Sequence, residues 1–498
     1  MNSSAFITLE NISKQFPGVL ALDRVSLTLN KGEVHCLAGQ NGCGKSTIIK
    51  VISGVYQPEK GARLLIDGKL FHQLTPSLSA HYGIQVIYQD LSLFPNFSVA
   101  ENIAIHRYQP GGDLWVRRGA MRQQALAAMQ RIGVTLDPDK KVEKLSIADR
   151  QLVAICRAIA ADARLVIMDE PTASLTRQEV NGLLRVVNEL KAAGICVVFV
   201  SHRLDEVMEV ADRISVMRDG KLVGTWPASE LDSHELAFLM TGQRFHYTPL
   251  PPYSAPTAVP RLALRNLTRH GKYHDISLAL HPGEIVSIVG LLGAGRTELC
   301  LSLFGMTRPD SGEIAIDGQA VTLNGNRDAI RHGIGYVSED RLTQGLIMDQ
   351  SIYDNTIVTV FDQLHTRAGL LDHRRADALV QRLIRELNIK VADSALAVKT
   401  LSGGNAQRIA IAKWVATQPR ILILDSPTVG VDIANKEGIY QIARDLAQQG
   451  MAVLMICDEI PEAYYNSHRI LVMRQGELVA EFLPQRCSEQ DIAEVVNA

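Results

Sequence analysis

One glycine-rich segment near the start of the chain has the residue types and spacing that hold the phosphates of a nucleotide. The pattern G-x-x-x-x-G-K-[ST] is met by Gly39, Gln40, Asn41, Gly42, Cys43, Gly44, Lys45 and Ser46, which Thr47 follows. In such a loop the glycines let backbone N–H groups converge on the β-phosphate at the positive end of a helix. Lys45 would reach the β- and γ-phosphates, and the Ser46 hydroxyl would ligate Mg²⁺. The alternative is a glycine-rich turn without a ligand, which the flanking strand and helix patterns disfavour.

An acidic pair further along the chain fits the same chemistry. Asp169 and Glu170 directly follow the apolar run Leu165–Met168, which is typical of a buried strand. Asp169 would hold Mg²⁺ through water, and Glu170 would orient and polarise the attacking water, because positioning dominates phosphoryl transfer. An acidic pair after a strand is often only structural, but behind a phosphate loop the catalytic interpretation is favoured.

The chain repeats these features. A second loop, Gly290-Leu-Leu-Gly-Ala-Gly-Arg296-Thr297, begins 251 residues after the first (290 − 39) and has arginine in place of lysine. Asp425 likewise ends an apolar run 256 residues after Asp169 (425 − 169). Motifs that recur in one order at a nearly constant offset indicate a tandem duplication.

The elements around these motifs indicate an α/β fold. The runs Val34–Ala38 and Ile285–Val289 predict a strand before each loop, and a helix is expected after each. Short apolar strands that alternate with helices are typical of a mainly parallel sheet. A length of 498 residues exceeds what one core normally serves, so we expect two domains of about 240 residues.

A proline-rich segment marks the boundary between the two halves. Five prolines lie between Phe245 and Pro260, where a continuous helix or central strand is therefore excluded. We predict a first domain over residues 5–242, a semi-rigid linker over 243–260 and a second domain over 261–498.

Composition argues against several classes of protein. The formal net charge is −2 with 21% charged residues, which gives no overall basic charge for nucleic acid. No apolar stretch approaches the roughly 20 residues of a membrane span, and the first residues lack the pattern of a signal peptide. Seven scattered cysteines without C-x-x-C pairs are typical of a reduced cytosolic chain.

The segment Leu401-Ser402-Gly403-Gly404-Asn405-Ala-Gln407 is the sharpest discriminator between classes of phosphate-loop protein. Serine and two glycines at the start of a helix offer a hydroxyl and bare N–H groups to a γ-phosphate. The segment nearly matches LSGGQ, the signature of ATP-binding-cassette (ABC) ATPases. Over its whole length the chain resembles the tandem ATPase subunit of bacterial ABC importers of the simple-sugar class, the ribose, galactose, arabinose and xylose group.

This resemblance implies much of the function. It implies two phosphate-loop ATPase domains, each with a mixed or parallel sheet core, a β subdomain and a helical subdomain. The cofactors would be ATP and Mg²⁺. The partners would be two integral-membrane permease subunits and, indirectly, a periplasmic solute-binding protein, with no nucleic acid. The chain would then lie peripherally on the cytoplasmic face of the bacterial inner membrane and energise the import of a monosaccharide or similar solute.

Three further residues match the family pattern. Phe16 stands where ABC domains place an aromatic ring under adenine; a core phenylalanine at a strand end is the alternative. Gln89 matches the glutamine that senses Mg²⁺, and His202 matches the histidine that contacts the γ-phosphate, 33 residues beyond Asp169 (202 − 169).

The second half departs from the pattern at several functional positions. Arg296 replaces the loop lysine, Ser426 the catalytic glutamate, Glu339 the glutamine and Asp458 the histidine, and we find no aromatic match for Phe16. The first half has instead lost its signature, which reads Leu145-Ser146-Ile147-Ala148-Asp149.

ABC domains pair head to tail, so each site combines the loop of one domain with the signature of the other. By the resemblance, Ser402, Gly403 and Gly404 would complete the site of Lys45, while the losses would fall on the other site. One hydrolytic site is therefore expected.

Two other functions are compatible with parts of the sequence. Soluble tandem ABC proteins that act on ribosomes also lack membrane spans, but they usually have a long charged linker and two intact sites. A regulatory nucleotide-binding protein without turnover is disfavoured by the intact first site.

Overall fold

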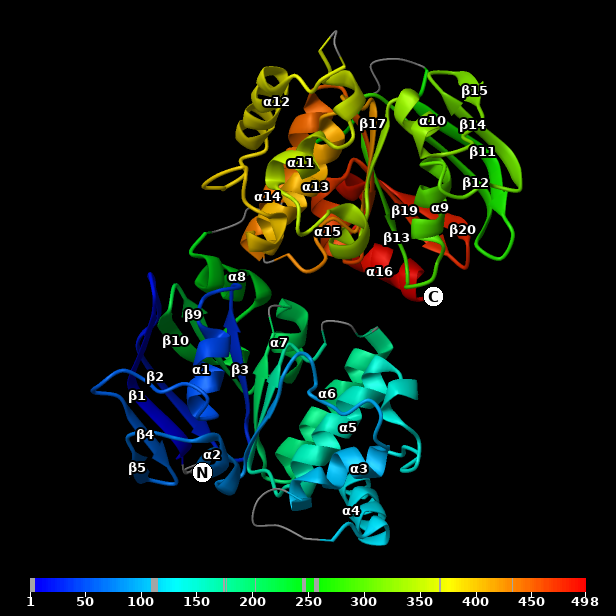
Figure 1. The fold of residues 1–498 in the computed structure, drawn as a ribbon. Coiled ribbons are helices and arrows are strands. Elements are labelled where there is room, and N and C mark those ends of the chain that lie inside the picture. Colours follow the sequence, from blue (N-terminus) through cyan, green and yellow to red (C-terminus); the bar gives the residue numbers. More distant parts are fainter. Residues whose placement is uncertain are drawn as a thin grey trace. The chain divides into compact units, whose positions relative to one another are not determined.

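The structure is a computed structural model that describes residues 5–108, 115–172, 175, 177–201, 203–243, 248–254, 259–366, 369–431 and 433–498. It divides into two compact units, Met1–Phe245 and His246–Ala498, which Figure 1 shows coloured along the sequence. Each unit has one antiparallel sheet, one larger and mostly parallel sheet, and helices around them. The predicted α/β class with duplicated units is confirmed.

The antiparallel sheet of the first unit has the strand order β2-β1-β4-β5. Its longest pair turns at Pro17 and Gly18, where Gly18 has a φ of 79° that a residue with a side chain rarely adopts. Ile12 pairs with Val25 and Leu9 with Leu27, and their side chains are buried. The strands are β1 (Ala5–Phe16), β2 (Val19–Asn30), β4 (Arg63–Ile66) and β5 (Lys69–Phe71).

The second sheet of this unit has the order β10-β9-β3-β8-β7-β6, and it is parallel except for the pair β9–β10. Every residue of β3 and β8 is buried; β8 is apolar throughout, whereas β3 includes His35, whose ring lies within hydrogen-bond distance of the Ser215 hydroxyl (2.8 Å). Leu37 of β3 and Asp169 of β7 both pair with Val200 of β8, so the ends of these strands meet at one edge. The strands are β3 (Val34–Gly39), β6 (Ile84–Ile87), β7 (Leu165–Asp169), β8 (Cys196–Val200), β9 (Arg213–Arg218) and β10 (Lys221–Pro227).

The helices of the first unit fall into two groups. One group packs along the sheets, whereas α3, α4 and α5 pack on one another as a separate helical part (Figure 1). They are α1 (Lys45–Ile52), α2 (Pro76–His81), α3 (Val99–Ala104), α4 (Arg118–Arg131), α5 (Ile147–Ala160), α6 (Arg177–Ala192), α7 (Leu204–Val210) and α8 (Ser233–Thr241).

The second unit repeats this plan. Its sheets have the orders β12-β11-β14-β15 and β16-β17-β18-β13-β19-β20. The strands are β11 (Leu262–Arg269), β12 (Tyr273–Leu280), β13 (Ile285–Val289), β14 (Ser311–Ile316), β15 (Gln319–Val321), β16 (Ile334–Val337), β17 (Ile421–Asp425), β18 (Ala452–Ile456), β19 (Arg469–Arg474) and β20 (Glu477–Phe482). The helices are α9 (Arg296–Leu303), α10 (Asn326–Arg331), α11 (Ile352–Ile357), α12 (His373–Glu386), α13 (Gly403–Val415), α14 (Ile433–Gln448), α15 (Ile460–Asn466) and α16 (Glu489–Asn497).

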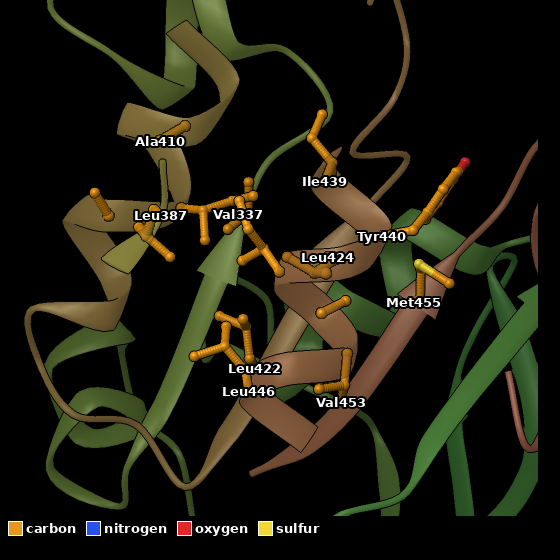
Figure 2. Close-up of a cluster of buried hydrophobic side chains, with 14 of the residues drawn as sticks. Val337, Leu387, Ala410, Leu422, Leu424, Ile439, Tyr440, Leu446, Val453 and Met455 are labelled. Atoms are coloured by element: carbon orange, nitrogen blue, oxygen red, sulfur yellow. The ribbon is translucent and has the colours of Figure 1, made fainter. Parts of the chain in front are cut away.

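The core of the second unit fixes the sheet against α14. Figure 2 shows Leu424 of β17 and Met455 of β18 beside Ile439 and Tyr440 of α14, all of them buried. Because β17 and β18 pack tightly against α14, the residues at the ends of these strands are held in fixed positions.

The described part of the proline-rich segment, residues 248–254, lies on the second unit. The Tyr253 hydroxyl donates to the carbonyl of Pro282 (2.8 Å), and its ring lies 5.3 Å from that of His468. Residues 244–247 and 255–258 of the predicted linker lie outside the described residues. Among the helices of the described part, none is both long and apolar enough to cross a membrane.

Candidate nucleotide sites

The first phosphate loop joins β3 to α1, as predicted. Gly39 and Gly44 have φ angles of 158° and 106°. A Cβ atom on Gly39 would lie 2.5 Å from the carbonyl oxygen of Met217, and one on Gly44 would lie 2.6 Å from that of Ala21. Both positions therefore require glycine for steric reasons, which holds the loop backbone close to the sheet.

Lys45 begins α1, and its side chain is buried within the loop. Its Nζ donates to the carbonyls of Gly39 (2.6 Å) and Gln40 (2.8 Å). The ammonium group is thus folded back over the loop, where a bound phosphate would meet it. Lys45 is only 6% exposed.

The other loop residues divide by exposure. Gln40 and Thr47 are half-buried, whereas Asn41, Gly42 and Ser46 are exposed. Cys43 is buried among apolar side chains, and burial raises the pKa of its thiol. Cys43 can therefore meet a ligand only through its backbone, while the Ser46 hydroxyl is open to solvent and to a cation.

Asp169 and Glu170 lie at the end of β7, beside this loop. Burial and the Glu170 carboxylate raise the pKa of Asp169, and Lys45 and a hydrogen bond from Ser46 oppose that shift. Lys45, Ser46 and Asp169 therefore form one electrostatic cluster, although the sequence separates Asp169 from the others by more than a hundred residues.

The backbone at Glu170 is strained. Its φ is 49°, in the left-handed region that costs a residue with a side chain about 1–3 kcal/mol. Its N–H donates to the carbonyl of Val200 on β8 (2.9 Å), which holds the conformation. Ser426, at the equivalent place in the second unit, has a φ of 43° and a matching bond to Ile456 (3.2 Å). The strain thus belongs to the fold, and it does not by itself mark a catalytic residue.

The three other residues predicted for the first site are Gln89, Phe16 and His202. Gln89 is exposed just beyond β6. Phe16 ends β1 and is half-buried, with its ring edge-on to Tyr56 at 5.3 Å and Lys14 Nζ 5.6 Å from its centre. Phe16 is thus not enclosed in the core, although Tyr56 and Lys14 both lie against its ring. His202 lies outside the described residues.

A buried glutamate that the sequence did not single out lies behind the first site. Glu206 of α7 is fully buried. It accepts hydrogen bonds from the hydroxyls of Thr172 (2.5 Å) and Ser201 (3.1 Å), and Arg203 Nη1 lies 2.9 Å from its other oxygen. Glu206 therefore ties the segment after the acidic pair to the segment after β8.

The second unit has a glutamate at the position of Glu206, but its cationic partner is a lysine and not an arginine. Glu462 accepts hydrogen bonds from Thr428 (2.9 Å) and from Lys436 Nζ (2.8 Å). Glu459 stands where the first unit has Arg203 (459 − 256) and also accepts from Lys436, at 3.1 Å. The glutamate repeated at an offset of 256 residues (462 − 206) is the sequence signal that could have found this network.

The second phosphate loop keeps the backbone of the first but not its charge arrangement. Gly295 has a φ of 100°, close to that of Gly44. The Arg296 guanidinium reaches away from the loop to the end of β18 and donates to the carbonyl of Cys457 (2.7 Å) and to Asp458 Oδ1 (3.0 Å). The loop cation is therefore already paired within the protein.

The acidic residues of the second unit are also engaged. Asp425 is fully buried and accepts hydrogen bonds from Thr297 (3.2 Å) and from the Tyr336 hydroxyl (2.8 Å), one on each carboxylate oxygen. Burial and the carboxylates of Asp458 and Asp425 raise the pKa of Glu339. Tyr336 was not predicted, because nothing in its local sequence marks it.

The two signature segments begin equivalent helices with different contacts. Ser402 precedes α13, and its hydroxyl accepts from the Asn405 side chain (3.2 Å) but from no backbone N–H of the first helical turn. Ser146 instead caps α5 by accepting from the backbone N–H of Asp149 (3.1 Å). Ile147, where Gly403 stands in the other unit, is 51% exposed.

Gly404 also has a structural reason to be glycine. A Cβ atom on Gly404 would lie 2.4 Å from Asn435 Cγ of α14. The close packing of α13 on α14 therefore requires a residue without a Cβ atom. Gly403 is less restricted, since its Cβ would lie 3.0 Å from the flexible Arg341 side chain and 3.1 Å from the carbonyl oxygen of Gly430. Gly403 is thus the better indicator of a ligand of the two.

Known proteins resemble the chain along its whole length. The profile of the ABC transporter family matches residues 22–173 and 273–429. The ribose import ATP-binding protein RbsA 1 of Agrobacterium fabrum is 41% identical over 477 residues, which cover 96% of this chain and 93% of that protein. The ribose import ATP-binding protein RbsA 2 of Escherichia coli O157:H7 is 39% identical over 492 residues, which cover 99% and 97%.

A solved structure also shows similarity, to part of the chain. It is the ADP conformation of an ATP-binding cassette of an ABC transporter, 29% identical, covering 48% of this chain and 95% of that one with a TM-score of 0.43. Since both halves match one family profile and the relatives match from end to end, the chain belongs to the ABC transporter family, as a tandem ATP-binding protein.

Proposed function

We propose that the chain hydrolyses ATP to energise the import of a monosaccharide, or a similar small polar solute, through membrane permease subunits. The observation that carries this proposal is the single complete phosphate site in the first unit, where Lys45, Ser46 and Asp169 meet. The names of the relatives supply the solute class, since both act in ribose import.

The first site has a fitting residue for each part of Mg²⁺-ATP. Lys45 and the backbone N–H groups of Gly39 to Thr47 would hold the phosphates. Oxygen ligands suit Mg²⁺, and Ser46, Asp169 and Gln89 would offer them, partly through water. Phe16 would stack on adenine, His202 would contact the γ-phosphate, and Glu170 would orient the attacking water. Bound Mg²⁺ would supply neutralisation of the phosphate charge.

The two units correspond in our proposal to two ATPase domains, residues 5–242 and 261–498, joined by the linker 243–260. They would pair head to tail within the chain, so that Ser402, Gly403 and Gly404 bind the nucleotide held by Lys45. This proposal rests on the family resemblance and on the exposure of Ser402, whose hydroxyl is not used as a helix cap.

Arginine at the two signature serines provides a test of this pairing. Ser402→Arg would place bulk and charge against the γ-phosphate, so ATP turnover and transport should fall about 10²-fold or more, as when a preorganised contact to the transition state is lost. Ser146→Arg should leave turnover within about threefold of wild type, but it removes a helix cap worth about 1 kcal/mol. Steady-state ATPase activity and thermal unfolding of both variants check this expectation.

The two measurements should therefore rank the variants in opposite orders. Ser402→Arg should be the inactive but stable one, because Ser402 makes no side-chain cap. A photoreactive group on the γ-phosphate of bound ATP should label residues 401–405. Labelling of residues 145–149 alone would contradict the head-to-tail pairing.

The permease would dock on the helical part of the first unit, near residues 90–144. Between Gln89 and α3, the rings of Phe94 and Phe97 stack at 5.3 Å and are 48% and 42% exposed. The loop that carries them is fixed by Asn102, which accepts from the N–H of Phe94 (2.9 Å). Two exposed aromatic rings on a rigid loop suit a cytoplasmic helix of a permease, since aromatic anchors dominate many interfaces.

Phe94→Asp should weaken assembly with the permease about tenfold or more, because loss of an aromatic anchor costs about 2 kcal/mol. Co-purification of the chain with its permease in detergent measures this. Leu70→Asp is the matched control: Leu70 is 41% exposed but lies on β5 in the antiparallel sheet, and its substitution should leave assembly unchanged. Equal loss from both variants would count against the proposed surface.

A role on ribosomes is not favoured, since these relatives are named for import. The experiment that separates the two functions is isolation of the tagged chain from cells. We expect polytopic membrane proteins in the complex. Recovery with ribosomes and without membrane proteins would refute the import function.

A further inference from the structure

In the second loop, the cationic side chain of Arg296 is paired with groups of the protein itself. Lys45 in the first unit donates to the carbonyls of Gly39 and Gln40, within 2.8 Å, and to Cys43 Sγ at 4.0 Å, all in its own loop, and none of these partners carries a charge. Arg296 is instead bonded to Asp458 at 3.0 Å and to Cys457 at 2.7 Å, across the mouth of its loop. The loop cation of such a site reaches the β- and γ-phosphates, and Asp458 lies against it on the side away from the loop, so a γ-phosphate would have to displace Asp458.

The residues of the second unit that correspond to the proposed Mg²⁺ ligands are also bonded to protein groups. Thr297 and Tyr336 donate to the two oxygens of Asp425, and Asp425 has no exposed surface. By strand register Tyr336 stands where the first unit has Val86, since Met168 pairs with Ile87 and Leu424 with Val337. The first unit thus has no hydroxyl at this place, and the engagement of Asp425 by Tyr336 is a feature of the second unit alone.

The backbone cradle itself is preserved. Gly293 and Gly295 have φ angles of 81° and 100°, against 79° and 106° for Gly42 and Gly44. A cavity of about 50 Å³ lies against the loop, bordered by Glu339, Ser426 and Asp458. At about 10–15 Å³ for each water, it has room for a few waters and so for one phosphate group.

The charges at the edge of this cavity oppose a further phosphate. Glu339 and Asp458 both border it, and the one cation among its lining residues, Arg296, is paired with Asp458. A terminal phosphate would add negative charge beside these carboxylates, where the first unit has Gln89 in place of Glu339. A shorter ligand would keep the loop N–H contacts and avoid this repulsion.

We propose that the second loop is a nucleoside diphosphate site that works without a divalent metal and discriminates against nucleoside triphosphates. The Arg296–Asp458 pair occupies the place of the terminal phosphate, and the Thr297–Asp425–Tyr336 bonds occupy the place of the metal. This inference rests on the proposed nucleotide-binding function of the phosphate loops, but it does not depend on turnover at the first site.

The test uses the full-length chain with Lys45→Ala, which weakens the first site, and the fluorescent nucleotides mant-ADP and mant-ATP. We expect saturable mant-ADP binding whose Kd changes less than about twofold when Mg²⁺ is replaced by EDTA. The Kd for mant-ATP should be at least about tenfold higher, which corresponds to one lost favourable contact. Equal affinities, abolition of mant-ADP binding by EDTA, or no nucleotide binding would each overturn the proposal.

Substitutions in the second unit assign the binding to this loop. In the Lys45→Ala background, the isosteric Asp458→Asn should tighten mant-ATP about tenfold and leave mant-ADP nearly unchanged. The combination of Arg296→Lys, Asp458→His and Tyr336→Val introduces the residues of the first unit and should make mant-ATP binding depend on Mg²⁺. No response to Asp458→Asn would contradict the proposal.

The outcome is separable from the proposed function. ATP turnover by the wild-type chain with its permease depends on the first site, so it would persist if the second loop bound no diphosphate. Absence of that turnover would instead refute the ATPase function and leave the mant-ADP result intact.

Discussion

The chain with Glu170→Gln, assembled with its permease, should lose about 10²–10⁴-fold of its ATP turnover and still bind ATP. This range is the usual contribution of a general base. Glu170 is the glutamate that follows the strand aspartate of the first unit, and its equivalent in the second unit is Ser426. No second carboxylate at that position is available to replace it.

The amide substitution is suited to the geometry at this place. Glu170 has a left-handed backbone held by the carbonyl of Val200, and glutamine keeps the size of the side chain. The loss should therefore appear in kcat, with little change in the affinity for mant-ATP. Both quantities are measured on the same preparation, by steady-state ATPase activity and by fluorescence titration.

Ser426→Ala is the matched control. Ser426 has the same backbone conformation and the same type of bond to the neighbouring strand, so the two substitutions disturb equivalent places. It should change turnover by no more than about twofold. If Glu170→Gln retained turnover within a few-fold of wild type, the assignment of Glu170 would be wrong.

The elements around the sites were predictable because their signals are local. The run Leu165–Met168 forms β7, which ends at Asp169 as expected, and Ile285–Val289 forms β13 as predicted. A short, continuous apolar run that ends at a turn signal is typical of a buried strand. Because the chain is duplicated, each strand and motif occurs twice, and the second copy supports the prediction made from the first.

Side-chain partners were not predictable, because they depend on segments far apart in the sequence. Arg296 pairs with Asp458, 162 residues away, and Tyr336 with Asp425, 89 residues away. The sequence showed that Arg296 and Asp458 are unusual residues for their positions. It could not show that they bind one another, since that requires the approach of α9 to the end of β18.

The glycines illustrate a related limit. Gly39 and Gly404 both belong to recognisable motifs, and both are also required for packing, against Met217 and Asn435. A motif therefore does not separate a ligand role from a steric one. Only the surrounding atoms do, and they distinguish Gly404 from the less crowded Gly403.

The two loop cations should respond unequally to removal. Lys45→Ala deletes a buried ammonium that faces the phosphate space, so ATP turnover should fall about 10²–10³-fold, as when one preorganised charge is lost from a transition state. Arg296→Ala removes a guanidinium that is already committed to Asp458 and Cys457. It should leave turnover within about threefold of wild type.

The second substitution has its own cost, which lies in stability. Arg296 is 7% exposed, whereas the Asp458 side chain is 42% exposed, so Asp458 can be rehydrated when its partner is removed. Arg296→Ala should therefore lower the melting temperature only through the bond that it removes from the carbonyl of Cys457, while turnover persists. Lys45→Ala likewise removes a donor from the carbonyls of Gly39 and Gln40, so the two variants should differ in turnover more than in melting temperature. Arg296→Lys, which keeps the charge but lacks the planar fork of the guanidinium, should give an intermediate stability.

These effects are read from steady-state ATPase activity of the assembled transporter and from thermal unfolding of the isolated chain. Turnover is expressed per assembled transporter for each variant, so that differences in expression or assembly do not enter the comparison. Equal losses of ATP turnover from Lys45→Ala and Arg296→Ala would mean that both loops hydrolyse ATP. In that case the pairing of Arg296 with Asp458 would have to open during turnover, and the second loop would be a triphosphate site.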